Sequence, residues 1–204
     1  MLERPMRIAR RLGLRAGLVA IACAILAACA QTAPPAPLPQ LTFSHLEKIR
    51  LNVGSVEIVE SYVPPLRGPN IEHLLPVSPT EAARRWATDR LAALGTEGSA
   101  KFVIDTASVV ETKLAVEKGL RGAVTVDQSE RYDAVLAVTV EIRNDRGFRL
   151  AFATARAERN RTVSENLTVS ERQAIQFELV EDLIAALNAE LEAKIAEFLS
   201  AYIL

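Results

Sequence analysis

The chain has few of the residues that carry most enzyme and metal chemistry. Its 204 residues include only two cysteines, Cys23 and Cys29, and two histidines, His45 and His73. The histidines do not have the HxxxH or HExxH spacing of a zinc site, and the sequence contains neither a Gly-rich phosphate loop nor a G-x-S-x-G turn. We therefore expect no metal, no cofactor and no nucleophile–base pair.

Carboxylates also give no sign of a paired acid/base site. Most of them alternate with apolar residues in segments typical of strands, which places them on a solvated sheet face. The residues concerned are Glu57, Glu60, Asp105, Glu111, Asp133 and Glu141. The sequence thus predicts that the protein is not an enzyme and has no catalytic residues.

A strongly basic segment is missing from the body of the chain. Positions 1–28 hold five arginines and one acid, Glu3. Subtracting these from the totals of 24 basic and 25 acidic residues leaves 19 and 24, a net charge of −5 for residues 29–204. A mildly acidic body has no electrostatic attraction for phosphate backbones, so no nucleic acid is expected as a partner.

The longest uncharged hydrophobic run, Ala16–Ala28, has 13 residues. That is too short for a membrane span of about 20 residues but fits the apolar core of a secretory signal, and arginines precede it. The run ends in Leu26-Ala27-Ala28-Cys29, which resembles the lipobox of bacterial lipoproteins. The alternative is a plain secretory signal that happens to contain a cysteine.

The lipobox resemblance implies removal of the signal peptide 1–28 and attachment of acyl chains, palmitate among them, to Cys29. It makes a lipid bilayer the first partner, and the absence of aspartate at Ala30 favours the periplasmic side of the outer membrane over the inner membrane. Cleavage would remove Cys23 and acylation would cap Cys29. The mature chain would then have no thiol for a disulfide or a metal site.

The segment after Cys29 is rich in proline and has no charge. Residues 30–40 contain four prolines, which favours an extended tether. We assign residues 29–45 to this tether and residues 46–204 to a single periplasmic α+β domain, since typical domains have about 100–200 residues.

The first half of this domain is predicted as a strand, a loop and a helix. Alternation over 49–53 changes phase at Gly54, which suggests a bulge, and a Pro-rich loop follows to about Val77. Ser78-Pro79-Thr80-Glu81 matches a capping box with proline at the first helical position. The helix is predicted to bury Trp86 and to end with Gly95 in the C′ position.

Three strands and a long helix are predicted next. The strands are 101–116, 132–142 and 148–156, with a loop over 117–130 that contains Gly119 and Gly122, and a turn over 144–147. The apolar face of the third strand is predicted as Phe148, Leu150 and Phe152. Thr168-Val-Ser-Glu171 matches a second capping box, and apolar residues then recur at a mean step of about 3.6 up to Tyr202.

The predicted fold class is therefore α+β, with about four strands in one antiparallel or mixed sheet. The order is β-α-β-β-β-α, and two helices pack on one face. This layout, with the strand–turn–strand from Tyr132 to Arg156 and the helix ending in Ile195–Leu199, resembles the PqiC-like auxiliary lipoproteins of ABC-type transport systems. The lipopolysaccharide-assembly lipoprotein LptE has a comparable build. The resemblance implies a non-enzymatic partner of an envelope protein complex.

The chain ends on an apolar segment for which we keep two alternatives. Either it folds back on the tether or the first strand, or it forms an exposed anchor for a partner protein. The residues are Phe198, Leu199, Tyr202, Ile203 and Leu204. An alternative function is that of a lipid or small-molecule carrier, which requires an apolar cavity of several hundred Å³ between helices and sheet.

Overall fold

The computed structural model describes residues 38–114 and 128–204, and Leu38–Leu204 form one compact unit. The predicted signal peptide 1–28, Cys29 and most of the predicted tether lie outside the described residues. So does the predicted loop over 117–130, apart from its last three residues, which belong to a strand.

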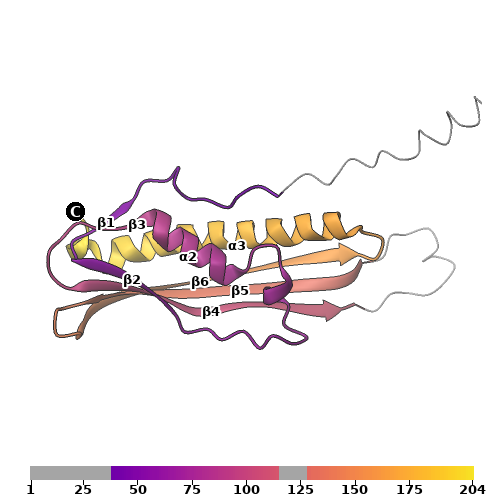
Figure 1. Ribbon diagram of the computed structural model, residues 1–204, viewed down its shortest axis with the longest axis horizontal. Coiled ribbons are helices and arrows are strands. Elements are labelled where there is room, and N and C mark those ends of the chain that lie inside the picture. Colours follow the sequence, from indigo (N-terminus) through magenta and orange to yellow (C-terminus); the bar gives the residue numbers. More distant parts are fainter. Residues whose placement is uncertain (1–37, 115–127) are drawn as a thin grey trace, which may run out of the picture. The chain divides into compact units, whose positions relative to one another are not determined.

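The fold is α+β, as predicted (Figure 1). The main sheet has four strands in the order β2-β4-β5-β6. The parallel pair is β2 (Ser55–Glu60) with β4 (Ser99–Lys113), and β4, β5 (Gln128–Arg143) and β6 (Arg149–Ser164) pair antiparallel. A second, parallel pair joins β1 (Ile49–Leu51) to β3 (Leu91–Ala93).

Two α-helices, α2 (Pro79–Arg90) and α3 (Val169–Phe198), pack against each other and against the same sheet. Two short 3₁₀ turns, η1 (Glu72–Leu74) and η2 (Ser200–Tyr202), complete the described elements. Figure 1 shows α3 running alongside β5 and β6, while α2 lies against β4 and β2. For the main sheet and the two helices, the order is the predicted β-α-β-β-β-α, and the short pair β1 and β3 was not predicted.

The core lies between the helices and β5, whose inner face was predicted correctly. Trp86 of α2 is fully buried, stacks on Phe102 with ring centroids 5.6 Å apart, and donates its indole N–H to Asn188 of α3. The predicted β5 residues Tyr132, Ala134, Leu136, Val138, Val140 and Ile142 are all buried.

Both predicted helix starts are confirmed. The Ser78 hydroxyl accepts a hydrogen bond from the Glu81 backbone N–H of α2 at 3.1 Å. At α3, the backbone N–H of Glu171 donates to the Thr168 hydroxyl while the Glu171 carboxylate accepts from the Thr168 N–H, which is a complete capping box. These local signals need no tertiary contacts, which is why the sequence was sufficient.

The first strand is divided rather than bulged. Residues 49–51 pair with β3 and residues 55–60 pair with β4, so the chain moves from one sheet to the other at Gly54. The Gly54 N–H donates to the carbonyls of Glu97 and Gly98, both at 3.1 Å. The predicted phase change was correct, but its cause is a change of partner strand.

The predicted end of the first helix at Gly95 is wrong. α2 ends at Arg90, Leu91 is extended, and β3 pairs with β1. Gly95 is needed for a close approach instead, because a Cβ there would lie 2.6 Å from the backbone N of Val53. Pairing with β1, a contact distant in sequence, overrides the local helical pattern.

The predicted apolar face of the third strand is also wrong. Phe148, Leu150 and Phe152 are 67%, 53% and 50% exposed. The core face of β6 consists of Ala153, Ala155, Ala157 and Val163, and the strand continues to Ser164. Small alanines opposite Val140, Val138 and Leu136 leave room for α3 to pack against the strand.

The boundary between tether and domain lies earlier than the predicted residue 46. Leu41 and Phe43 are buried in the core of the body. Their backbone is fixed by α2, because Arg85 donates to the Leu41 carbonyl at 2.8 Å and the Phe43 N–H donates to Asp89 at 2.8 Å. Residues 38–45 therefore belong to the folded body.

Candidate functional site

The C-terminal segment, predicted as a partner-binding site, folds back on the first strand. The Asn52 N–H donates to the Tyr202 carbonyl at 2.8 Å and the Leu204 N–H donates to the Arg50 carbonyl at 2.9 Å. Leu51 and Ile203 form an antiparallel bridge. Of the two alternatives kept above, fold-back on the first strand is the observed one.

Fold-back removes one of the five predicted residues from any docking surface. Leu199 is fully buried, and Tyr202 is packed against the core. Phe198, Ile203 and Leu204 are 53%, 37% and 61% exposed. The predicted regular helix to Tyr202 is also corrected, because α3 ends at Phe198 and a 3₁₀ turn follows.

The β5–β6 turn lies at the same end of the body as the C-terminus (Figure 1). Asn144 organises the turn, since its side-chain oxygen accepts hydrogen bonds from the N–H groups of Arg146 and Phe148. Gly147 has φ +81°, a left-handed conformation that glycine adopts without strain. We call this part of the molecule, with Phe148, Leu150, Phe198, Ile203 and Leu204, the hairpin end.

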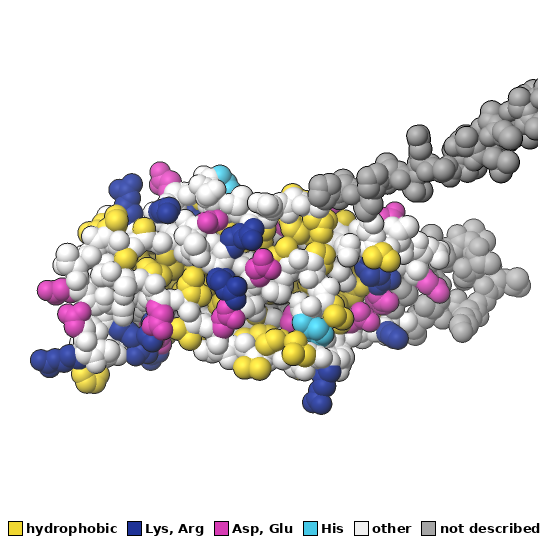
Figure 2. Space-filling model, viewed as in Figure 1, with side chains coloured by type: hydrophobic (Ala, Val, Ile, Leu, Met, Phe, Trp, Pro, Cys, Tyr) yellow, Lys and Arg dark blue, Asp and Glu magenta, His cyan; other side chains and the backbone are white. Residues whose placement is uncertain are grey.

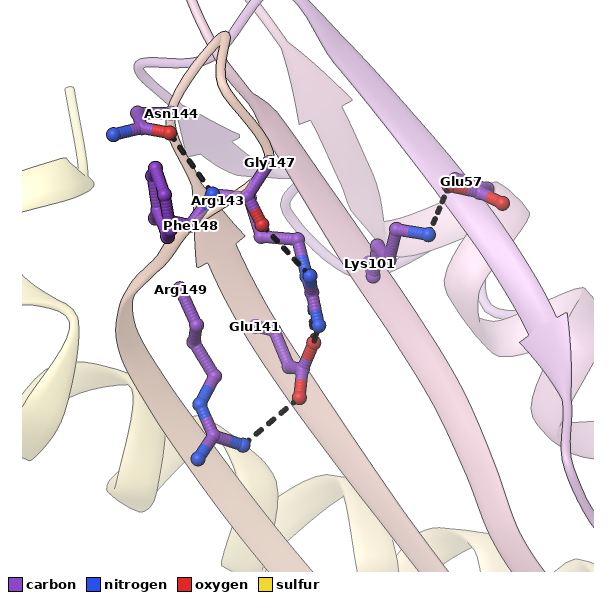
Figure 3. A network of polar contacts seen from close by, with 8 residues as sticks. All are labelled: Glu57, Lys101, Glu141, Arg143, Asn144, Gly147, Phe148 and Arg149. Atoms are coloured by element: carbon purple, nitrogen blue, oxygen red, sulfur yellow. Dashed lines mark hydrogen bonds and ion pairs between the residues drawn. The ribbon is translucent and has the colours of Figure 1, made fainter.

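A polar network stiffens the sheet next to the hairpin end (Figure 3). Arg143 donates to the Gly147 carbonyl at 2.8 Å and to Glu141 at 2.6 Å. Arg149 donates to the other Glu141 oxygen at 3.0 Å and lies 4.6 Å above the Phe152 ring. The Glu141 carboxylate thus holds both arginines, and Arg143 connects it to the turn.

The environment of Glu141 differs from the solvated face predicted for it. The residue is 8% exposed because the two arginines cover it. Burial opposes its ionisation, but the hydrogen bonds from Arg143 and Arg149 outweigh burial and lower the pKa of the carboxyl. Lys101 and Glu57 form a separate ion pair at 2.9 Å on the neighbouring strands.

A cleft of about 400 Å³ opens at the hairpin end. Its wall includes Asn52, Glu97, Asp145, Arg143, Leu150 and Tyr202. Asp145 is already engaged, since its carboxylate accepts from the Gly98 N–H at 2.7 Å. The lining includes apolar, charged and amide side chains.

The surface beside these residues carries charges of both signs. On the face shown in Figure 2, hydrophobic side chains are exposed in small groups between basic and acidic ones. Large exposed hydrophobic side chains include Val63, Leu66, Leu74 and Leu94 as well as those of the hairpin end. The face in view therefore has no uniform charge that would select one kind of polyelectrolyte.

The histidines and the other carboxylates do not converge. His45 and His73 are exposed and come from separate loops. Among residues 38–114 and 128–204, no three or more His, Cys, Asp or Glu side chains are grouped so that they could hold a metal ion. Over the same residues, no helix combines the length and the apolar character required to cross a membrane.

Sequence reasoning missed a buried carboxylate, Glu72, in the loop before α2. It is 3% exposed and accepts hydrogen bonds from Tyr62 at 2.9 Å, Asn70 at 3.3 Å and the Val109 N–H at 3.2 Å. Burial raises the pKa of Glu72, but its backbone and side-chain hydrogen bonds outweigh this and lower it overall. Its neighbours Tyr62, Asn70 and Pro69 gave no periodic signal from which burial could be predicted.

Comparison with known proteins does not assign the chain to a family. No family model matches the sequence, and no curated protein is significantly similar to it.

Proposed function

We propose that the protein is a lipid-anchored, non-enzymatic component of the bacterial envelope. In this proposal, acylated Cys29 holds it on the periplasmic side of the outer membrane. The body docks on an ABC-type transport or outer-membrane assembly complex as an auxiliary component. The observation that carries the proposal is the lipobox-like Leu26–Cys29 at the end of a 13-residue apolar run.

The docking role is supported by the large apolar side chains that are exposed at one end of the body. Trp86, Phe102, Leu136 and Leu183 are fully buried in the core cluster. The hairpin end instead offers apolar side chains to a partner, and Figure 3 shows that a polar network fixes its backbone. Rigid presentation of apolar anchors lowers the entropic cost of association.

Metabolic labelling with palmitate tests the anchor. The full chain expressed in a bacterial host is expected to incorporate label and to sediment with membranes, and Cys29→Ser is expected to lose both properties. Cys23→Ser is the matched control, because cleavage would remove that residue from the mature protein. Labelling that persists in Cys29→Ser would show that the lipoprotein assignment is wrong.

Affinity purification from detergent-solubilised membranes tests the docking role. The wild-type chain is expected to co-purify with subunits of an ABC-type permease or an outer-membrane assembly complex. A Phe148→Ser/Leu150→Ser variant is expected to remain folded, since both side chains are more than half exposed, and to lose these subunits. Retention of the same subunits by this variant would exclude Phe148 and Leu150 as the contact.

A further inference from the structure

The last strand of the sheet has an open edge of unusual length. β6 covers 16 residues, Arg149–Ser164, and pairs with β5 on one side. Within the described part of the chain, no strand pairs with its other side. Its register with β5 has no shift from Ala151 to Val163, and the strand contains neither proline nor glycine.

Proteins commonly protect such an edge with proline, a bulge, charged side chains or a covering loop, because its unpaired N–H and C=O groups otherwise invite another strand. On the opposite side of the sheet, a loop covers the part of β4 that lies beyond β2. Beyond the end of β2, the Ile71 N–H donates to the Val109 carbonyl at 2.8 Å and the Glu111 N–H donates to the Pro69 carbonyl at 2.9 Å. Glu72 accepts from the Val109 N–H. The loop thus covers the stretch of β4 that β2 does not reach, whereas no such loop bonds are seen along β6 within the described residues.

We propose that β6 pairs antiparallel with β6 of a second copy of this chain, about a two-fold axis perpendicular to the sheet at Ala157. Such an axis keeps the faces of the two sheets aligned, so the two four-stranded sheets would become one continuous sheet. Ala157 would lie opposite Ala157 of the partner subunit. A residue that precedes Ala157 by a given number of positions would lie opposite the partner's residue that follows Ala157 by the same number.

Charge complementarity selects this register. Arg156 and Glu158 lie on the outer face, 54% and 65% exposed, and form an ion pair with each other at 2.8 Å. With the axis at Ala157, Arg156 lies opposite Glu158 of the partner subunit, and Glu158 opposite the partner's Arg156. Opposite charges in directly facing positions stabilise an antiparallel pair, and like charges destabilise it.

The neighbouring registers that keep the same faces aligned are unfavourable. Moving the axis by one residue toward the start of β6 places Arg156 opposite its own copy, and moving it toward the end places Glu158 opposite its own copy. On the inner face, the chosen register places Arg159 and Arg161 opposite Ala155 and Ala153 of the partner subunit. A long side chain therefore faces a short one at both positions.

Charge reversal at these two positions tests the proposal. The full chain, purified in detergent and analysed by light scattering that separates protein from detergent mass, is expected to be a dimer. Arg156→Glu and Glu158→Arg should each be monomeric, or should dissociate at a concentration at least tenfold higher, because like charges then face each other. The Arg156→Glu/Glu158→Arg double variant should restore the dimer.

Mixing the two single variants gives the sharpest result. Copies with different tags should co-purify when Arg156→Glu is co-expressed with Glu158→Arg, because every facing pair is then of opposite charge, although neither variant pairs with itself. Arg131→Glu is the matched control: Arg131 forms the same kind of ion pair with Asp133, at 2.7 Å, one strand away from the edge. It should remain dimeric.

Three results would overturn the proposal. One is that the wild-type chain remains monomeric at a protein concentration 100-fold above the detection limit of the assay. Another is a dimer that neither single reversal weakens, which would place the interface elsewhere. The third is failure of the two single variants to associate when co-expressed, which would exclude the register at Ala157.

Discussion

Glu72 takes the place of a neighbouring strand where β2 has ended. Its carboxylate satisfies the Val109 N–H of β4 while Tyr62 and Asn70 hold the carboxylate in position. Glu72→Gln would leave at least one of these three donors without an acceptor, because an amide has one oxygen and brings its own N–H groups. We expect it to destabilise the fold by about 1–3 kcal/mol in urea unfolding at neutral pH.

Tyr62→Phe is the control for that measurement. It removes one donor and leaves the carboxylate with Asn70 and the Val109 N–H, so the loss of stability should be smaller than for Glu72→Gln. If Glu72→Gln were as stable as the wild type, water rather than Glu72 would be the hydrogen-bond acceptor for the Val109 N–H at the edge of β4.

Two glycines with positive φ allow steric crowding to be separated from backbone strain. Gly98 and Gly147 have φ of +71° and +81°. A Cβ at Gly98 would lie 2.4 Å from the Arg143 carbonyl oxygen, whereas a Cβ at Gly147 would meet nothing within 4 Å. Gly147→Ala is expected to cost about 1–2 kcal/mol, the usual cost of a left-handed alanine. Gly98→Ala should cost clearly more in the same urea titration.

At the scale of elements, β5 carries the core and β6 carries exposed side chains. Leu136→Ala removes a fully buried side chain, and we expect a loss of about 2–5 kcal/mol in unfolding free energy. Leu150→Ala, at a residue that is 53% exposed, should lose less than about 1 kcal/mol. The reverse order of the two losses would mean that the faces of the strands are misassigned.

The C-terminal segment belongs to the body through β1. Deleting residues 198–204 removes the buried Leu199 and the hydrogen bonds from Asn52 to Tyr202 and from Leu204 to Arg50. We expect Tm to fall by several degrees, since about 1 kcal/mol corresponds to a shift of 2–4 °C in a domain of 150–250 residues. Phe198→Ser is the control and should leave Tm within about 1 °C, because Phe198 is exposed.

Local signals in the sequence were sufficient for some elements and misleading for others. The caps at Ser78 and Thr168 and the strict alternation of β5 depend on residues close in the chain, and they were predicted correctly. β3 and the inward alanines of β6 depend on pairing with Ile49 and packing against α3, which the local pattern does not contain. Of the hairpin end, the sequence analysis named the C-terminal residues and placed Phe148 and Leu150 on the apolar face of a strand, whereas both are exposed.

For the molecule as a whole, the unfolding free energy should fall toward both extremes of pH. On the acid side, hydrogen bonds hold the pKa values of Glu72 and Glu141 below the ordinary value of 4.5. A lowered pKa in the folded state means that the unfolded chain takes up protons first. The stability due to these two groups is therefore complete above about pH 4.5 and is lost as the pH falls through their folded-state values.

On the alkaline side, the unfolding free energy falls as the pH rises. Burial and the hydrogen bond to Glu72 raise the pKa of Tyr62 from 10.0 to about 12. The unfolded chain therefore loses its tyrosine proton first, and stability due to Tyr62 is complete below about pH 10 and declines as the pH rises toward 12. Urea unfolding of the wild-type chain from pH 3 to pH 11.5 should show both declines.

Single variants should reduce the two declines separately. Glu72→Gln and Glu141→Gln should each reduce the acid decline, and Tyr62→Phe should reduce the alkaline decline without changing the slope that Glu141 contributes. Burial also raises the pKa of Tyr132, which adds to the alkaline decline. Glu165→Gln, at an exposed turn position, controls for the loss of one negative charge. An acid decline of the same steepness in the Glu72→Gln/Glu141→Gln double variant would place its origin in other carboxylates.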